Sequence, residues 1–201
     1  MAQGGGKTIR GPQGVTGPPG TSGSTGPQGP TGPALGGIIT QRLDPEGAQF
    51  MPTGFPQYTR NIGTNMPMTA LAYIETGVQA AFWKMDTFLY HTGTINANIY
   101  WYAATGVTGA VSWGIAMNAV TPQTDTDNVE NKVFAGESTG ASAHLGTTNK
   151  RLHKLTVPIT QTDSLANQDI SWVRIRRLAD ATEDTLIGDV YLERVILQFV
   201  D

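Results

Sequence analysis

Glycine stands at every third position near the start of this 201-residue chain, and this repeat constrains the fold more than any other feature. The repeat runs over eight uninterrupted triplets, with glycine at Gly11, Gly14, Gly17, Gly20, Gly23, Gly26, Gly29 and Gly32. Three polyproline-II chains can wind around one another only if a hydrogen atom occupies each axial place, which requires this period. A flexible linker is the alternative, but a linker has no reason to keep phase over eight triplets. The repeat therefore predicts a homotrimer.

Residues 11–36 are therefore predicted to form a collagen-like stalk, although the triplets are poor in stabilising features. Proline occupies a third position only at Pro19, and no charged residue lies between Gly11 and Leu35, so ion pairs cannot set the stagger of the chains. At about 3 Å of rise per residue the stalk would span roughly 70 Å. We expect it to be a spacer that depends on a second trimerising element.

The first ten residues form a short arm that carries Lys7 and Arg10 and no acid. The run GGGKT does not complete a phosphate-binding loop, because the required glycine five places before Gly6 is replaced by Met1. Two interpretations stay open for residues 1–10. They are a mobile tail, or an arm whose two cations grip an acidic support.

The remaining residues, 37–201, change to a period of two, which is typical of β-strands. Ile95, Ala97, Ile99 and Trp101 alternate with polar or aromatic residues, and the pattern resumes after a Thr/Gly turn. The expected strands are 68–75, 78–89, 95–102, 111–117, 132–135, 152–159, 170–177 and 186–200. Many short strands separated by turn residues predict an all-β head, a jelly-roll-like β-sandwich that trimerises the chain.

The last expected strand changes phase along its length. Leu192 belongs to an even-numbered apolar set, whereas Val195 and Leu197 belong to an odd-numbered set. A β-bulge inserts one residue into a strand and shifts the phase in this way. We therefore expect a bulge near Arg194.

Charge distinguishes the head from the rest of the chain. All 16 acids and 11 of the 13 bases lie in residues 37–201, so the head carries a net charge near −5 and the arm with the stalk +2. Charged residues are only 14% of the chain, and no block of Lys or Arg is present. We therefore expect no nucleic-acid partner and no electrostatic hold on a membrane. The absence of cysteine excludes disulfides and thiol chemistry.

Metal and cofactor chemistry find little support in the sequence. His91, His144 and His153 lie in different expected segments, and none has the spacing of a zinc motif with another. Asp125 and Asp127 begin no complete calcium loop and are interpreted as residues of a solvated turn. We expect no metal and no cofactor.

Catalytic motifs are equally sparse. Gly136 to Gly140 match G-x-S-x-G around Ser138, but the following stretch has the composition of a loop, and no acid lies between Ser138 and His153, the last histidine. Asp180, Glu183 and Asp184 lie in a polar connection, where exposed charge is ordinary. We expect the protein not to be an enzyme.

A more specific pattern is the alternation around Trp172. Trp172, Arg174 and Arg176 are expected on one face of a strand, with Ser171, Val173 and Ile175 on the other. Such a face can stack on a sugar, meet an acidic partner, or form a subunit contact within the trimer; we favour the subunit contact. Tyr100 and Tyr102, on the face opposite Trp101, are likewise assigned to a trimer interface or a ligand face.

The stretches IYWYAATGVTGAVSWGIAM and DSLANQDISWVRIRRLADATEDTLIGDVYLERVIL resemble the C-terminal domains of virion proteins of tailed bacteriophages. The resemblance rests on paired aromatic strands around a Thr/Gly turn, D-S-L before W-V-R-I-R-R, and D-x-x-x-G-D before the final strand, and it covers roughly the second half of the head. It implies a trimeric fibre, spike or capsid decoration protein, and not an enzyme. Unlike long tail fibres, this sequence has only ten residues before the stalk, which favours a small auxiliary protein.

The sequence and this resemblance together predict a homotrimeric capsid decoration protein on the virion surface. Lys7 and Arg10 would dock on the major capsid protein or another virion protein, and the head would project outward. Two alternatives stay open. The first is a receptor-binding fibre tip that recognises a host surface glycan, and the second is a bacterial surface or spore-coat filament of the same design.

Overall fold

Alternating apolar and polar residues form strands in the computed structural model, which describes residues 11–17, 38–87, 90, 93–106, 108–146 and 148–199. The chain divides into two units, Met1–Ala34 and Leu35–Asp201. In the first unit, residues 11–17 are exposed and form neither helix nor strand. The triple helix predicted for residues 11–36 stays a prediction, and most of the repeat lies outside the described residues.

The second unit contains ten strands and one 3-10 turn, η1 (Pro45–Gly47). The strands are β1 (Ile39–Leu43), β2 (Gln57–Ile62), β3 (Pro67–Tyr73), β4 (Val78–Met85), β5 (Ile95–Ala103), β6 (Ala110–Val120), β7 (Ser138–Ala143), β8 (His153–Ile159), β9 (Ile170–Leu178) and β10 (Val190–Phe199). Apart from η1, the described residues form no helix, and within them no helix has the length and hydropathy of a membrane span.

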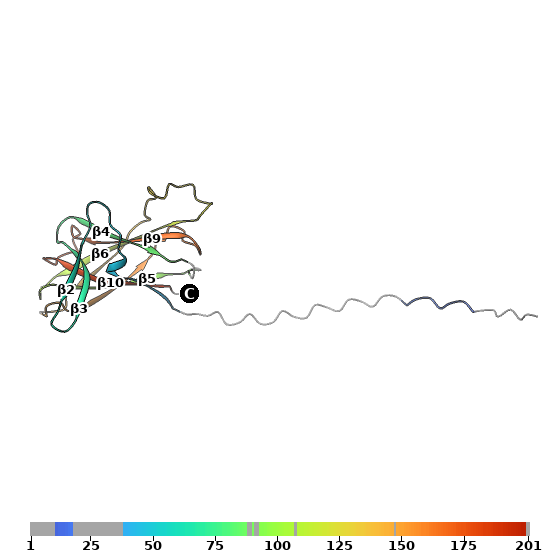
Figure 1. Ribbon diagram of the computed structural model, residues 1–201, viewed down its shortest axis with the longest axis horizontal. Helices are drawn as coiled ribbons and strands as arrows, with labels where there is room; N and C mark the ends of the chain where they lie inside the picture. Colours follow the sequence, from blue (N-terminus) through green and yellow to red (C-terminus); the bar gives the residue numbers. More distant parts are fainter. Residues whose placement is uncertain are drawn as a thin grey trace, which may run out of the picture. The chain divides into compact units, whose positions relative to one another are not determined.

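The strands form two antiparallel sheets (Figure 1). A six-stranded sheet has the order β2-β3-β10-β5-β8, with β1 also paired to β10. A four-stranded sheet has the order β4-β9-β6-β7. The prediction of an all-β sandwich is confirmed.

Most connections between consecutive strands cross from one sheet to the other. The chain changes sheet from β3 to β4, from β4 to β5, from β5 to β6, and in each step from β7 to β10. Such crossings are typical of Greek-key sandwiches. The narrower jelly-roll assignment and the trimerisation of the head stay predictions.

One apolar layer lies between the sheets. Trp101 on β5 and Trp113 on β6 are fully buried, and the Tyr73 ring meets Trp113 edge to face with centroids 5.2 Å apart. On β9 the inward residues Val173 and Ile175 are also fully buried. Burial of each such side chain contributes about 1.5–3 kcal/mol, so this layer is the main source of stability of the head.

The expected bulge near Arg194 is confirmed. The pairing of β10 with β5 shifts register between Leu192 and Arg194. Leu192 and Val195 therefore both face the core, although they are three residues apart. The extra residue, Glu193, is partly exposed and pairs with the guanidinium of Arg194 at 2.5 Å.

The expected strands agree with the structure except in four places. Strands β1, β2 and β7 were not predicted, and the strand expected at 132–135 is absent. Residues 132–135 belong to a long connection between β6 and β7, where one backbone bond, from Ala135 N–H to the Met117 carbonyl, holds them beside β6. Their Lys-Val-Phe-Ala pattern is apolar enough for a strand, but it finds no partner strand.

A buried ion pair holds the connection between β9 and β10. The Arg177 guanidinium contacts both carboxylate oxygens of Asp184 at 2.9 and 2.7 Å, and the two side chains are 1% and 2% exposed. Arg177 also donates to the carbonyls of Leu186 and Gly188. Asp184 in turn accepts the Ser112 N–H, which ties the connection to β6. The interpretation of Asp184 as an ordinary exposed acid is therefore wrong.

We predict that Asp184→Asn lowers the free energy of unfolding of the head by about 3–5 kcal/mol, because it leaves the Arg177 charge buried without a counterion. Asp180→Asn removes a nearby exposed carboxylate and should change it by less than about 0.5 kcal/mol. Urea unfolding of both variants checks this. Equal midpoints for the two variants would contradict the assigned role of the pair.

Candidate binding face on the four-stranded sheet

The outer face of β9 carries the three residues whose alternation predicts a common face. Along β9, buried Val173 and Ile175 alternate with partly exposed Trp172, Arg174 and Arg176. On either side, β4 and β6 place Phe82 and Ala116 opposite Arg174. The structure thus places Trp172, Arg174 and Arg176 together, and their role as a trimer or ligand face stays a prediction.

Both arginines of this face are bound by one carboxylate of the same chain. Arg176 donates from Nε and Nη2 to Glu137 Oε1 and Oε2 at 2.7 and 2.5 Å, and Arg174 Nη2 lies 3.4 Å from Oε1. Glycine at 114 makes room for the acid, because a Cβ there would lie 2.5 Å from Glu137 Cδ. The cations are therefore largely satisfied before any acidic partner arrives.

The two guanidinium groups respond differently to this pairing. The hydrogen bond that Arg176 donates to Glu137 raises the pKa of Arg176, whereas burial lowers the pKa of Arg174 despite the same carboxylate. The two arginines differ in their surroundings, because the Arg174 side chain also lies over the Phe134 ring, with Cζ 5.0 Å from the ring centroid. Sequence reasoning missed Glu137, because it is 37 and 39 residues from its partners and no local pattern links them.

A hollow of about 210 Å³ lies on this face, and we call it the aromatic hollow. Its walls come from the segment 49–51, from strands β4, β6 and β9, and from the connection over residues 121–137, called the 121–137 loop. The lining residues are Gln49, Phe50, Met51, Phe82, Asn118, Val129, Glu130, Lys132, Phe134 and Trp172. Four of these ten side chains are aromatic.

Backbone pairing and ring contacts position these walls. Gln49 and Phe82 exchange two backbone hydrogen bonds of 2.7 and 3.0 Å, which place the segment 49–51 along the edge of β4. The rings of Phe82 and Phe134 lie 5.8 Å apart and join the loop to the sheet. Trp172 lies under the Lys84 ammonium, with Nζ 5.8 Å from the ring centroid.

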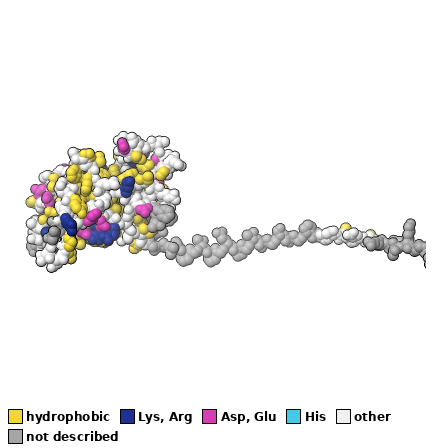
Figure 2. Space-filling model, in the orientation of Figure 1, with side chains coloured by type: hydrophobic (Ala, Val, Ile, Leu, Met, Phe, Trp, Pro, Cys, Tyr) yellow, Lys and Arg dark blue, Asp and Glu magenta, His cyan; other side chains and the backbone are white. Residues whose placement is uncertain are grey.

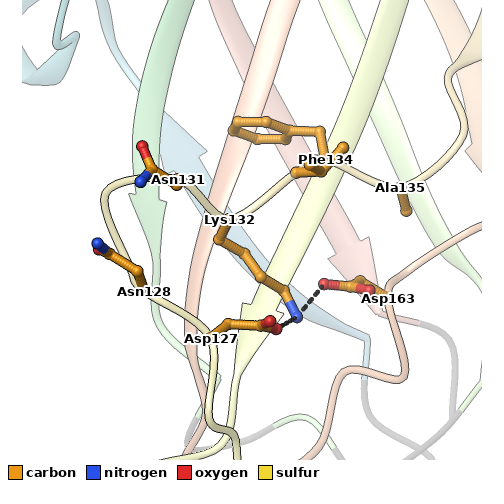
Figure 3. Close-up of a pocket in the computed structure, with 8 residues that line it drawn as sticks. Asp127, Asn128, Asn131, Lys132, Phe134, Ala135 and Asp163 are labelled. Atoms are coloured by element: carbon orange, nitrogen blue, oxygen red, sulfur yellow. Dashed lines mark hydrogen bonds and ion pairs between the residues drawn. The ribbon is translucent and has the colours of Figure 1, made fainter.

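A second hollow, of about 410 Å³, is lined by residues of the same loop and by Asp163 (Figure 3). Lys132 Nζ lies 2.7 Å from Asp127 and 3.4 Å from Asp163, while the Phe134 ring is directed away from them. The hydrogen bond to Asp127 is the main cause that raises the pKa of Lys132. The contact with Asp163 ties the 121–137 loop to the connection between β8 and β9.

The acids once considered for calcium have protein partners. Asp127 pairs with Lys132, and Asp125 accepts the Thr121 N–H at 2.9 Å. In the part of the chain that the structure describes, no group of three or more His, Asp or Glu side chains is placed to hold a metal ion.

Ser138 opens strand β7, so the loop expected after it is wrong for residues 141–143, whereas the described residues 144–146 and 148–150 form neither helix nor strand. Ser138 Oγ accepts the Thr160 N–H at 3.1 Å and lies 3.3 Å from the Thr160 hydroxyl. These bonds join β7 to the end of β8. The expectation that the chain is not an enzyme stays a prediction.

Tyr100 and Tyr102 lie on the other sheet, on the face of β5 opposite Trp101. Tyr102 is 1% exposed and stacks on Tyr191 of β10, with centroids 5.0 Å apart and planes 6° apart, whereas Tyr100 is partly exposed. The sandwich therefore separates these tyrosines from Trp172. Their assignment as a trimer or ligand face stays a prediction.

Other predicted site residues belong to the first unit. Lys7, Arg10, Gly20, Gly23, Gly26, Gly29 and Gly32 lie outside the described residues. Gly11, Gly14 and Gly17 are described and exposed, and an added Cβ at each would meet no atom of the chain within 4 Å.

Two of the histidines, which lie in different expected segments, meet in the fold. His144 and His153 are 7% and 5% exposed, their ring centroids are 4.6 Å apart, and His153 stacks on Trp101 at 4.5 Å. His153 Nε2 accepts the Leu145 N–H at 2.9 Å, which requires the neutral ring. Burial and the nearby His144 lower the pKa of His153. His91 lies outside the described residues.

Surface chemistry on the head agrees with its low charge. On the side shown in Figure 2, hydrophobic and uncharged side chains cover most of the surface, and Lys, Arg, Asp and Glu appear only in scattered groups. Exposed apolar residues include Phe50, Met51 and Val129 at the aromatic hollow.

No protein-family model matches the chain, and no curated protein matches it in sequence. Among solved structures, a carbohydrate-binding module specific for non-crystalline cellulose is 7% identical, with 77% of this chain and 86% of that chain covered and a TM-score of 0.43. A carbohydrate esterase from Shiga toxin-encoding bacteriophage phi24B is 9% identical over 82% of this chain and 100% of that chain, with a TM-score of 0.41. A family 11 carbohydrate-binding module from Clostridium thermocellum is 10% identical over 83% and 90%, with a TM-score of 0.40. Similarity at this level carries no inference about the function of this chain.

We predict that acid destabilises the head through His153. An unfolded histidine has a pKa of about 6.5, so below that pH the unfolded chain binds a proton that the folded chain resists. The free energy of unfolding should therefore fall as the pH decreases below about 6.5. His153→Gln keeps an acceptor for the Leu145 N–H and cannot titrate, so it should flatten this dependence. Thermal melting between pH 7.5 and 5 checks this, and parallel profiles for the two proteins would contradict it.

Proposed function

We propose that the protein is a homotrimeric structural protein of a bacteriophage virion that decorates the capsid and projects a β-sandwich head. The observation that carries the proposal is the glycine at every third position from Gly11 to Gly32. A single chain has no use for this period, since an added Cβ at Gly11, Gly14 or Gly17 meets nothing within 4 Å of its own chain. Two further copies of the chain supply the crowding that excludes side chains.

The head is the second trimerising element in this proposal. The stalk has no charged residue between Gly11 and Leu35 and few third-position prolines, so it needs support from an adjoining domain. The head offers two outer sheet faces with partly exposed aromatic residues, Trp172 on one and Tyr100 on the other. Such residues are enriched at the centres of protein interfaces.

The arm attaches the trimer to the shell. Lys7 and Arg10 give three arms six positive charges, whereas each head carries a net charge near −5. Such a separation favours contact of the arm with an acidic surface and repels the head from it. The partner is then the major capsid protein or another virion protein. The resemblance of the aromatic strands to phage virion domains supports the same location.

The trimer is tested by Gly23→Asp in the full chain, with Ser24→Asp as the matched control. Aspartate at position 23 cannot fit the crowded axis, so the polyproline-II circular dichroism signal should melt at a lower temperature, while the head keeps the chain trimeric in sedimentation. Aspartate at position 24 points outward and should change neither. The proposed triple-helical stalk would be refuted by a monomeric wild-type chain, or by equal melting temperatures of the two variants.

The docking role is tested by Lys7→Gln with Arg10→Gln. Removal of six charges per trimer should reduce retention on purified phage heads and make the remaining retention less sensitive to salt. Lys150→Gln with Lys154→Gln removes the same charge from exposed head positions and should leave retention unchanged. Equal retention of both double variants would refute the electrostatic arm, and absence of the protein from phage heads would favour the bacterial filament.

A further inference from the structure

We propose that the aromatic hollow is a binding site for a neutral carbohydrate. The site belongs to one head, and it requires that the heads meet through the Tyr100 face of the six-stranded sheet and not through the Trp172 face. It goes beyond the virion role above, and either proposal can fail alone.

Aromatic ring surfaces are gathered at the hollow. Phe50, Phe82, Phe134 and Trp172 line one hollow, and Phe50 and Met51 are 40% and 58% exposed. Monomeric proteins rarely leave clustered rings open to water without a partner. The apolar C–H faces of a sugar ring pack against such aromatic surfaces, and these rings are held in place by the contacts of Phe82 with Phe134 and of Phe134 with Arg174.

Hydrogen-bonding groups lie beside these rings. Asn118 is 4% exposed and lines the hollow, and its Oδ1 accepts the Trp172 N–H at 3.1 Å. That bond orients the amide, and among the described residues its Nδ2 has no partner. The Nδ2 atom is not enclosed within the protein, so its N–H groups can donate to an acceptor on a ligand in the hollow. A sugar hydroxyl is such an acceptor, and Gln49 and Glu130 offer further partners around it.

Charge decides the class of sugar. Lys132 is bound by Asp127 and Asp163, and Arg174 lies beside Glu137, so these two cations are already compensated. The exposed Lys84 and the exposed Glu130 leave one charge of each sign near the hollow. An anionic sugar would gain no net electrostatic attraction at this hollow, whereas binding of a neutral sugar does not depend on such attraction.

Size decides how much of the ligand enters. The hollow of about 210 Å³ is smaller than the roughly 300–1,000 Å³ of sites for drug-sized ligands. It therefore suits one sugar ring at a time, with the rest of a chain lying across the rim. Affinity per head should be weak, in the millimolar range, and a trimer with three such heads gains by multivalency.

The test is calorimetric titration of the full chain with neutral hexasaccharides, namely cello-, malto-, manno- and chitohexaose, and with a hyaluronan hexasaccharide as the anionic probe. Binding of at least one neutral probe is expected, with quenching of tryptophan fluorescence. Trp172→Ala and Phe50→Ala should each weaken that binding about tenfold, because each removes a ring that packs on the sugar.

Tyr58→Ala is the matched control, since Tyr58 is 48% exposed on β2 of the other sheet and lines no part of the hollow; it should leave binding unchanged. Phe50 lies outside the core, so Phe50→Ala keeps the test valid if Trp172→Ala fails to melt cooperatively. The proposal is overturned by no binding of any neutral probe at about 10 mM, by binding of the hyaluronan probe alone, or by neutral binding that Phe50→Ala and Trp172→Ala leave unchanged.

Discussion

The apolar layer between the two sheets is the constraint on which the rest of the head depends. Each strand that borders it must direct alternate side chains inward, as Val173 and Ile175 do on β9. The residues between them are then forced onto an outer face, whatever their chemistry. Trp172, Arg174 and Arg176 share that face because the inward positions of β9 are already committed to the core.

Electrostatics then decide what the outer face presents. Glu137 binds Arg174 and Arg176, and Lys132 is held by Asp127 and Asp163, so most of the local charge is neutralised within the chain. Compensated charges interact weakly with distant partners. The remaining open chemistry is aromatic and amide, which is why the face suits an uncharged ligand or another apolar protein surface better than an acidic one.

Local pattern predicted the strands that alternate clearly and failed where alternation is weak. The long runs that became β5, β6, β9 and β10 were recognised, including the bulge near Arg194. Strand β7, Ser138–Ala143, was missed because Ser, Thr, Gly and Ala give no apolar alternation, and its place is set by pairing with β6. The strand predicted at 132–135 is the opposite error, because its residues favour a strand but the 121–137 loop offers no partner strand.

The sequence alone determined the period-three glycine repeat, the separation of charge between arm and head, and the two-faced character of the longest strands. These are local properties, because each depends on residues a few positions apart. Only the tertiary structure decided that Arg177 meets Asp184 inside the core, that the His144 ring contacts the His153 ring, and that Glu137 reaches two arginines. The aromatic hollow also depends on the tertiary structure, because its walls come from four separate stretches of chain that meet only in the folded head.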